Sequence, residues 1–146
     1  MVSLVFGRWR IPWSFRVWKG KGTPSPAHLG LKLVKCLPQK LTKYFKVIIL
    51  ADTAFGSIEF LHGIRQLKYH TIVGVRVDRK LVDGRILRRL HKRGQQVWFV
   101  GLNFPVTVSW YYLKRDNGKL EKRFVLSTRC GTRQLFKKLP TTRSGP

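Results

Sequence analysis

The chain has 146 residues, and its 30 Lys plus Arg against 6 Asp plus Glu give a formal net charge of +24. This length suits one compact domain. A hydrophobic content of 43%, with 12% aromatic residues, is enough for a packed core and argues against a disordered chain. A surface with so little negative charge attracts polyanions, so nucleic acid is the first partner to expect. An anionic membrane surface and an acidic protein are the alternatives.

Composition also excludes several classes of protein. The longest strongly apolar run, residues 47–51, falls far short of the roughly 20 residues that cross a bilayer. The apolar start at residues 1–6 is too short for a signal-peptide core, because Arg8 and Arg10 interrupt it. The cysteines and histidines stand apart without metal-ligand spacing, so we expect neither a disulfide framework nor a zinc site. A reducing cytoplasm is the expected setting.

The N-terminal part of the chain predicts a strand followed by a helix. Residues 13–19 alternate apolar and polar side chains, which indicates a half-buried strand. Ser25 and Pro26 are typical of an N-cap and a first helical position. Two adjacent apolar stripes follow, and Pro38 ends or kinks the helix. The stripes are Leu29, Leu33 and Cys36, and Leu31, Val34 and Leu37.

A βαβ unit is predicted next. Residues 46–51 are apolar without alternation, which is typical of a strand covered on both faces. Ser57 is placed to cap a helix that continues to Leu67, and residues 71–77 indicate a second buried strand. A strand, a helix and a strand in this order predict two parallel, adjacent strands with a right-handed crossover.

The second half of the chain predicts antiparallel structure. Its strongest local signal is Asp116-Asn117-Gly118, a sequence typical of a tight hairpin turn. The segments expected in order are a basic, loop-like or briefly helical stretch (81–94), a short strand (95–100) and the two hairpin strands (106–113 and 119–126).

Asp52 is the strongest candidate for chemistry among the six acids. It follows the most apolar strand and precedes a helix, at the edge where α/β sheets bind ligands. A carboxylate there suits Mg²⁺, the usual ion for phosphodiester cleavage. The alternative is a residue that caps a turn. Asp78 ends the neighbouring strand and could share a metal, although we favour its pairing with Arg76, Arg79 or Lys80.

Basic residues gather in two clusters that we expect to contact phosphates. The main cluster is Arg85, Arg88, Arg89, Lys92 and Arg93. The second is Arg8, Arg10, Arg16, Lys19 and Lys21. Trp9 or Trp18, beside this second cluster, could stack on a base, with burial in the core as the alternative. The chain has no Walker loop, no G-x-S-x-G motif and no Gly-rich dinucleotide fingerprint.

The sequence around Asp52 resembles a known family. Residues 47–57, Val-Ile-Ile-Leu-Ala-Asp-Thr-Ala-Phe-Gly-Ser, followed by Phe60 and Leu61, are similar to the segment around the second acid of DDE-type transposases from bacterial insertion sequences. Further blocks in the same order extend the resemblance over about residues 8–128. These blocks are residues 9–13, 20–26, 74–76, 105–112 and 122–128.

This resemblance implies an α/β fold, a ribonuclease-H-like mixed sheet with flanking helices and an antiparallel β-rich insertion at about residues 95–126. It also implies three acids, Asp, Asp and Glu, that hold two Mg²⁺ ions. The implied reaction is DNA cleavage at the ends of the element and strand transfer into target DNA. The implied partners are DNA and, in the intact family, further copies of the chain, with no membrane. The implied setting is a bacterial cytoplasm beside the nucleoid.

Only Asp52 has a clear counterpart among the three acids. No acid precedes it, and no Glu follows Glu121, which belongs to a predicted hairpin strand. We therefore expect residues 1–128 to be an incomplete catalytic domain, inactive alone because one carboxylate cannot hold two ions about 4 Å apart. Residues 129–146 are expected to be an irregular, disordered tail that follows from truncation or a frameshift.

The missing first strand should leave a sheet edge exposed. Two further hypotheses remain open. One is a basic nucleic-acid-binding protein without catalysis, and the other is a small Mg²⁺ nuclease that uses Asp52 and Asp78.

Overall fold

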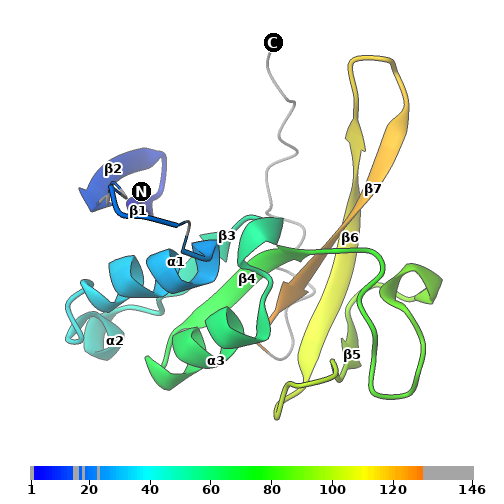
Figure 1. The fold of residues 1–146 in the computed structure, drawn as a ribbon. Coiled ribbons are helices and arrows are strands. Elements are labelled where there is room, and N and C mark those ends of the chain that lie inside the picture. Colours follow the sequence, from blue (N-terminus) through cyan, green and yellow to red (C-terminus); the bar gives the residue numbers. More distant parts are fainter. Residues whose placement is uncertain (1, 15–16, 18, 23, 130–146) are drawn as a thin grey trace.

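The computed structural model describes residues 2–14, 17, 19–22 and 24–129. Its architecture is of the α/β class, with a mixed five-stranded sheet, flanking helices and a separate two-stranded hairpin (Figure 1). The expected α/β class is therefore confirmed. The predicted tail from residue 130 onward lies outside the described residues.

The N-terminal hairpin differs from the prediction. Strands β1 (Val2–Phe6) and β2 (Trp9–Ser14) pair antiparallel, with Leu4 opposite Ile11. The expected half-buried strand at 13–19 is wrong, because Trp13 is 45% exposed and Val17 is 68% exposed. Strand β2 covers the start of the predicted segment, whose residues 15, 16 and 18 lie outside the described residues. Burial needs a covering layer, and β2 pairs only with the short strand β1.

The first helices follow this hairpin. Helix α1 (Pro26–Lys35) begins as expected, since the Ser25 side chain accepts the His28 N–H and Pro26 is the first helical residue. The stripe of Leu31, Val34 and Leu37 is buried, whereas Cys36 is exposed, so the other predicted stripe is buried only in part. A single turn, α2 (Leu41–Tyr44), comes next and was not predicted.

The βαβ unit is confirmed. Strand β3 (Ile48–Ala51), the short 3₁₀ turn η1 (Thr53–Phe55), helix α3 (Ile58–Gln66) and strand β4 (His70–Val75) follow in order. Ser57 caps α3 by accepting the Phe60 N–H. Strands β3 and β4 are adjacent and parallel. Both α1 and α3 lie on the same face of these strands (Figure 1). Helix α3 contributes Phe60, Leu61 and Ile64 to the core.

The antiparallel strands continue the same sheet. Strands β5 (Gln95–Val97), β6 (Val106–Lys114) and β7 (Leu120–Ser127) complete the order β3-β4-β7-β6-β5 (Figure 1). The predicted hairpin joins β6 to β7, and Gly118 takes a φ of +76° in its turn. The loops between β4 and β6 fold onto this sheet through buried apolar side chains. These are Leu81, Leu87, Leu90, Phe99, Leu102 and Phe104.

Strand β3 lies at the edge of the five-stranded sheet. Leu50, in its middle, is 60% exposed, so the prediction that this strand is covered on both faces is wrong. An apolar run shows that burial is favourable, but it does not supply a neighbouring strand or a second layer of helices. In the described part of the chain, no helix is long and apolar enough to span a membrane.

Candidate nucleic-acid interface

Asp52 lies at the carboxyl end of β3, as predicted, and its side chain is exposed. One of its carboxylate oxygens accepts the N–H of Thr53, which makes Asp52 the N-cap of η1. The structure therefore shows the capping role that the sequence left as the alternative. It also leaves the carboxylate at the sheet edge where α/β folds bind ligands.

The backbone beside Asp52 is held tightly against β4. A Cβ added at Gly74 would lie 2.5 Å from Thr53 Oγ1, and one at Gly56 would lie 2.8 Å from the Gly74 carbonyl oxygen. Only glycines allow these two segments to approach so closely. The Arg79 guanidinium donates to the Gly56 carbonyl at 2.9 Å, and burial lowers the pKa of Arg79. The Asp52 turn is thus packed and tied to the loop that follows β4.

Two other acids, Asp78 and Asp83, are paired with arginines. Asp78 pairs with Arg76 at 3.2 Å, the arrangement that the sequence favoured over a shared metal site. Hydrogen bonds from Arg85 lower the pKa of Asp83. Within the described ranges, no group of three or more His, Cys, Asp or Glu side chains is placed to hold a metal ion. A single exposed carboxylate does not fit a centre of two Mg²⁺ ions, so we derive no catalytic step through a metal.

The main basic cluster lies on the loop between β4 and β5. Three buried leucines in this loop anchor it, and the N–H of Arg88 donates to the Val77 carbonyl at 2.9 Å. The turn η2 (Leu87–Arg89) buries Leu87 and leaves the two arginines outside. All five basic side chains predicted for phosphate contact are exposed on this loop. They are Arg85, Arg88, Arg89, Lys92 and Arg93.

These five cations are not equivalent. Arg85 is paired with Asp83 at 2.6 Å, and Arg93 lies 5.6 Å from the centre of the Trp110 ring. By contrast, Arg88, Arg89 and Lys92 form no ion pair with any acid in the part of the chain that the structure describes. Those three side chains are the freest to contact phosphate.

The second predicted cluster is described in part. Lys19 and Lys21 are exposed, whereas Arg16 and Trp18 lie outside the described residues. Trp9 is 67% exposed, so it is not a core residue, and its stacking on a base stays a prediction. Trp98, which we expected in the core, is 48% exposed and is a further accessible aromatic side chain.

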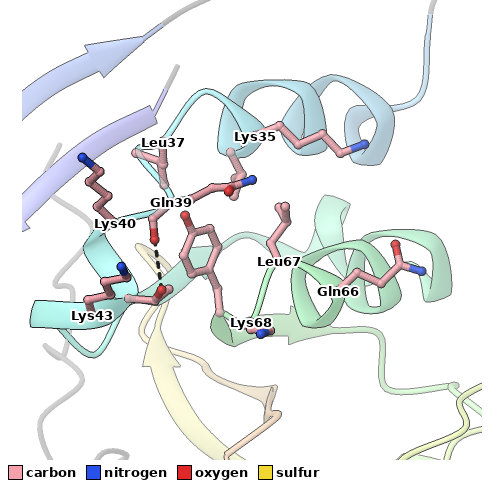
Figure 2. Close-up of a pocket in the computed structure, with 11 residues that line it drawn as sticks. Lys35, Leu37, Gln39, Lys40, Lys43, Gln66, Leu67 and Lys68 are labelled. Carbon is pink, nitrogen blue, oxygen red and sulfur yellow. Dashed lines mark hydrogen bonds between the residues drawn. The ribbon is translucent and has the colours of Figure 1, made fainter.

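Two adjoining cavities were also missed by the sequence analysis. They have volumes of about 410 and 330 Å³ and lie where α1, α2 and α3 end and where β3 and β4 begin. Figure 2 shows the first of them. The basic side chains that line them are five lysines and one histidine, and no Asp or Glu lines either cavity. These residues are Lys35, Lys40, Lys43, Lys46, Lys68 and His70. The lysines at positions 35–46 form a recognisable basic stretch, but only the fold brings Lys68 to it.

Comparison of the sequence with protein-family models and with curated proteins finds no match.

Proposed function

We propose that this chain binds DNA through its exposed cations, and that it is a partial DDE-type transposase catalytic domain with Asp52 in the position of the second acid. The observation that carries the proposal is the basic loop. On a chain of net charge +24, it presents Arg88, Arg89 and Lys92 to solvent without an ion pair to a described acid. Such side chains bind phosphate by displacing condensed counterions, irrespective of base sequence.

The arrangement around Asp52 supports the transposase part of the proposal. The acid follows a strand that is parallel to its neighbour, with a helix between them, and its carboxylate is exposed. Among the described residues, no strand pairs with the outer edge of β3, where a ribonuclease-H-like fold requires a further strand bearing the first acid. The antiparallel strands β5, β6 and β7 follow in the chain where the β-rich insertion of the family is expected.

Catalysis is not assigned to this chain alone. Asp52 is one carboxylate, and its nearest counterpart along the sheet edge, Asp78, is paired with Arg76. The proposed role is therefore DNA binding, in a bacterial cytoplasm beside the nucleoid, with further copies of a complete chain as partners in the intact family. Any Mg²⁺ held by Asp52 alone would be weakly bound.

A cleavage and binding assay tests this proposal. The chain is incubated with an end-labelled duplex and Mg²⁺ or Mn²⁺, and binding to the same duplex is followed by fluorescence anisotropy. We expect binding that weakens with salt, no cleavage, and unchanged binding for Asp52→Asn. Cleavage that disappears in Asp52→Ala would refute the claim of inactivity, and an absence of binding at low salt would refute DNA binding.

A non-catalytic nucleic-acid-binding protein is the second candidate. The observation that favours it is the hydrogen bond from the Thr53 N–H to Asp52, which gives this carboxylate a structural role without a metal. The genomic neighbourhood separates the two candidates. Inverted repeats, and a downstream frame that encodes an amphipathic helix with a Glu, are expected for the transposase and not for the alternative.

A further inference from the structure

We infer that the two lysine-lined cavities form a second contact surface for a nucleic-acid backbone, separate from the basic loop. This inference rests on the proposed DNA binding. We name the surface the lysine track and define it by Lys35, Lys40, Lys43, Lys46 and Lys68. The two cavities share Thr42, Lys43 and Lys68 in their walls, so they adjoin.

The charge of the lysine track is not neutralised by the described residues. No Asp or Glu lines either cavity, and none of the five lysines forms an ion pair with an acid in the described ranges. The ends of α1 and α3 oppose anion binding here, because each helix C-terminus contributes about half a negative charge. Five full positive charges exceed those two halves, so the site remains strongly attractive to anions.

The spacing of the lysines favours a chain of phosphates over a single small anion. In Figure 2, the ammonium groups of Lys35, Lys40, Lys43 and Lys68 lie apart around the rim and do not converge on one point. A site for one phosphate brings its donors together around the oxygens. Separated point charges along a depression instead match the repeating phosphates of a nucleic-acid backbone, with no means of reading bases.

The backbone conformation of Lys68 is an independent sign that the lysine track needs a positive charge at this position. It has a φ of +61°, the left-handed conformation that glycine usually provides just after a helix. It is the one non-glycine residue with a positive φ among the described residues. A lysine there is conformationally unfavourable, and this lysine lines both cavities.

The lysine track and the basic loop are distinct surfaces. The track adjoins the first residues of β3 and β4, whereas the basic loop follows the last residues of β4. Strand β4 has six residues, which corresponds to roughly 17 Å at about 3.3 Å per residue. Contacts made by the track should therefore add to those made by the loop.

The test compares two double variants with equal loss of charge. Lys43→Gln/Lys68→Gln removes the two lysines common to both cavities, and Lys114→Gln/Lys119→Gln removes two exposed lysines near the β6–β7 turn as a control. The probe is a fluorescein-labelled duplex of arbitrary sequence, titrated at several salt concentrations. Two lost phosphate contacts should lower the slope of log K against log salt by about 1.8, and the affinity at 0.1 M salt by about 60-fold.

Each outcome of this comparison decides the inference. A track variant that binds like the wild type, or a control that loses as much affinity, would overturn it. Strong competition by inorganic phosphate, beyond that of chloride at equal ionic strength, would show a small-anion site and would also overturn it. If the wild type does not bind the duplex at all, the proposed function itself fails, which is a different result.

Lys68→Gly is a variant that should not unfold the chain. Glycine suits the left-handed backbone at this position, so the melting temperature should rise. The same change removes one ammonium from the track, so DNA affinity should fall by about eightfold at 0.1 M salt. A more stable protein with unchanged affinity would contradict the inference.

Discussion

Neutralising the basic loop should weaken DNA binding in a way that depends on which arginine is removed. The proposed change is the triple variant Arg88→Gln/Arg89→Gln/Lys92→Gln, whose side chains are exposed and unpaired with any described acid. Arg85→Gln is the contrasting single variant from the same loop. Its guanidinium already donates to Asp83 at 2.6 and 2.8 Å, so its charge is partly compensated.

The expected magnitudes follow from the number of free cations. Each phosphate contact contributes about 0.9 to the slope of log K against log salt for duplex DNA. Three lost contacts should lower the slope by about 2.7 and reduce affinity at 0.1 M salt by about 500-fold. Arg85 is already paired with Asp83 and should make no phosphate contact of its own, so Arg85→Gln should leave the salt slope nearly unchanged. Its loss of affinity should stay below about threefold, well short of the roughly eightfold expected for Arg88→Gln alone.

Fluorescence anisotropy with a duplex of arbitrary sequence, repeated at several salt concentrations, measures both quantities. Circular dichroism should show that each variant retains the wild-type fold, because the substituted side chains are exposed. An equal loss for Arg85→Gln and for Arg88→Gln alone would refute the reasoning, since it would mean that ion pairing with Asp83 does not matter. An unchanged slope for the triple variant would show that the loop does not contact phosphate.

Three further predictions concern stability. Gly74→Ala should destabilise the fold by about 2 kcal/mol in urea unfolding, because the new Cβ would meet the Thr53 backbone at 3.0 Å; a wild-type midpoint would contradict this. Arg79→Ala should cost about 2 kcal/mol through loss of the hydrogen bond to Gly56, with thermal melting as the measurement. Burial, helped by nearby cations, lowers the pKa of His70 below 6.5, so the unfolded state binds more protons and stability should decline as the pH falls below that value. His70→Gln should flatten the dependence of unfolding free energy on pH, and a profile identical to the wild type would exclude His70 as its source.

Local signals in the sequence predicted the elements that depend on few residues. Ser25 and Ser57 cap helices where expected, and Asp116-Asn117-Gly118 forms the hairpin turn, because caps and tight turns are decided by hydrogen bonds and dihedral angles within a few residues. The parallel pairing of β3 with β4 also followed from the order of elements.

Features that depend on distant neighbours were not predictable in the same way. The apolar run of β3 does not reveal that the strand lies at an edge, since that depends on which strand pairs beside it. The sequence likewise does not reveal that β2 lacks a covering layer, which leaves its apolar side chains exposed. The lysine track needs Lys68 beside a segment more than 20 residues earlier, and only the tertiary fold creates that arrangement.

The sequence predicted where the residues of the candidate site lie, but not the chemical role of Asp52. The sequence placed Asp52 at the carboxyl end of a strand and placed Arg88 and Arg89 on a basic loop, because both positions follow from element boundaries. It could not choose between a metal ligand and a cap for Asp52, since both roles use the same carboxylate. The hydrogen bond to the Thr53 N–H depends on the local backbone geometry of η1.

Binding to a duplex with an uncharged backbone tests most directly that this chain recognises DNA through phosphate. The measurement compares an ordinary duplex with a methylphosphonate duplex of the same sequence and length at low salt. The account predicts strong binding to the ordinary duplex, lost in proportion to added salt, and almost none to the uncharged one. Equal affinity for the two duplexes would contradict it, since the exposed arginines and lysines would then not be the groups that hold DNA.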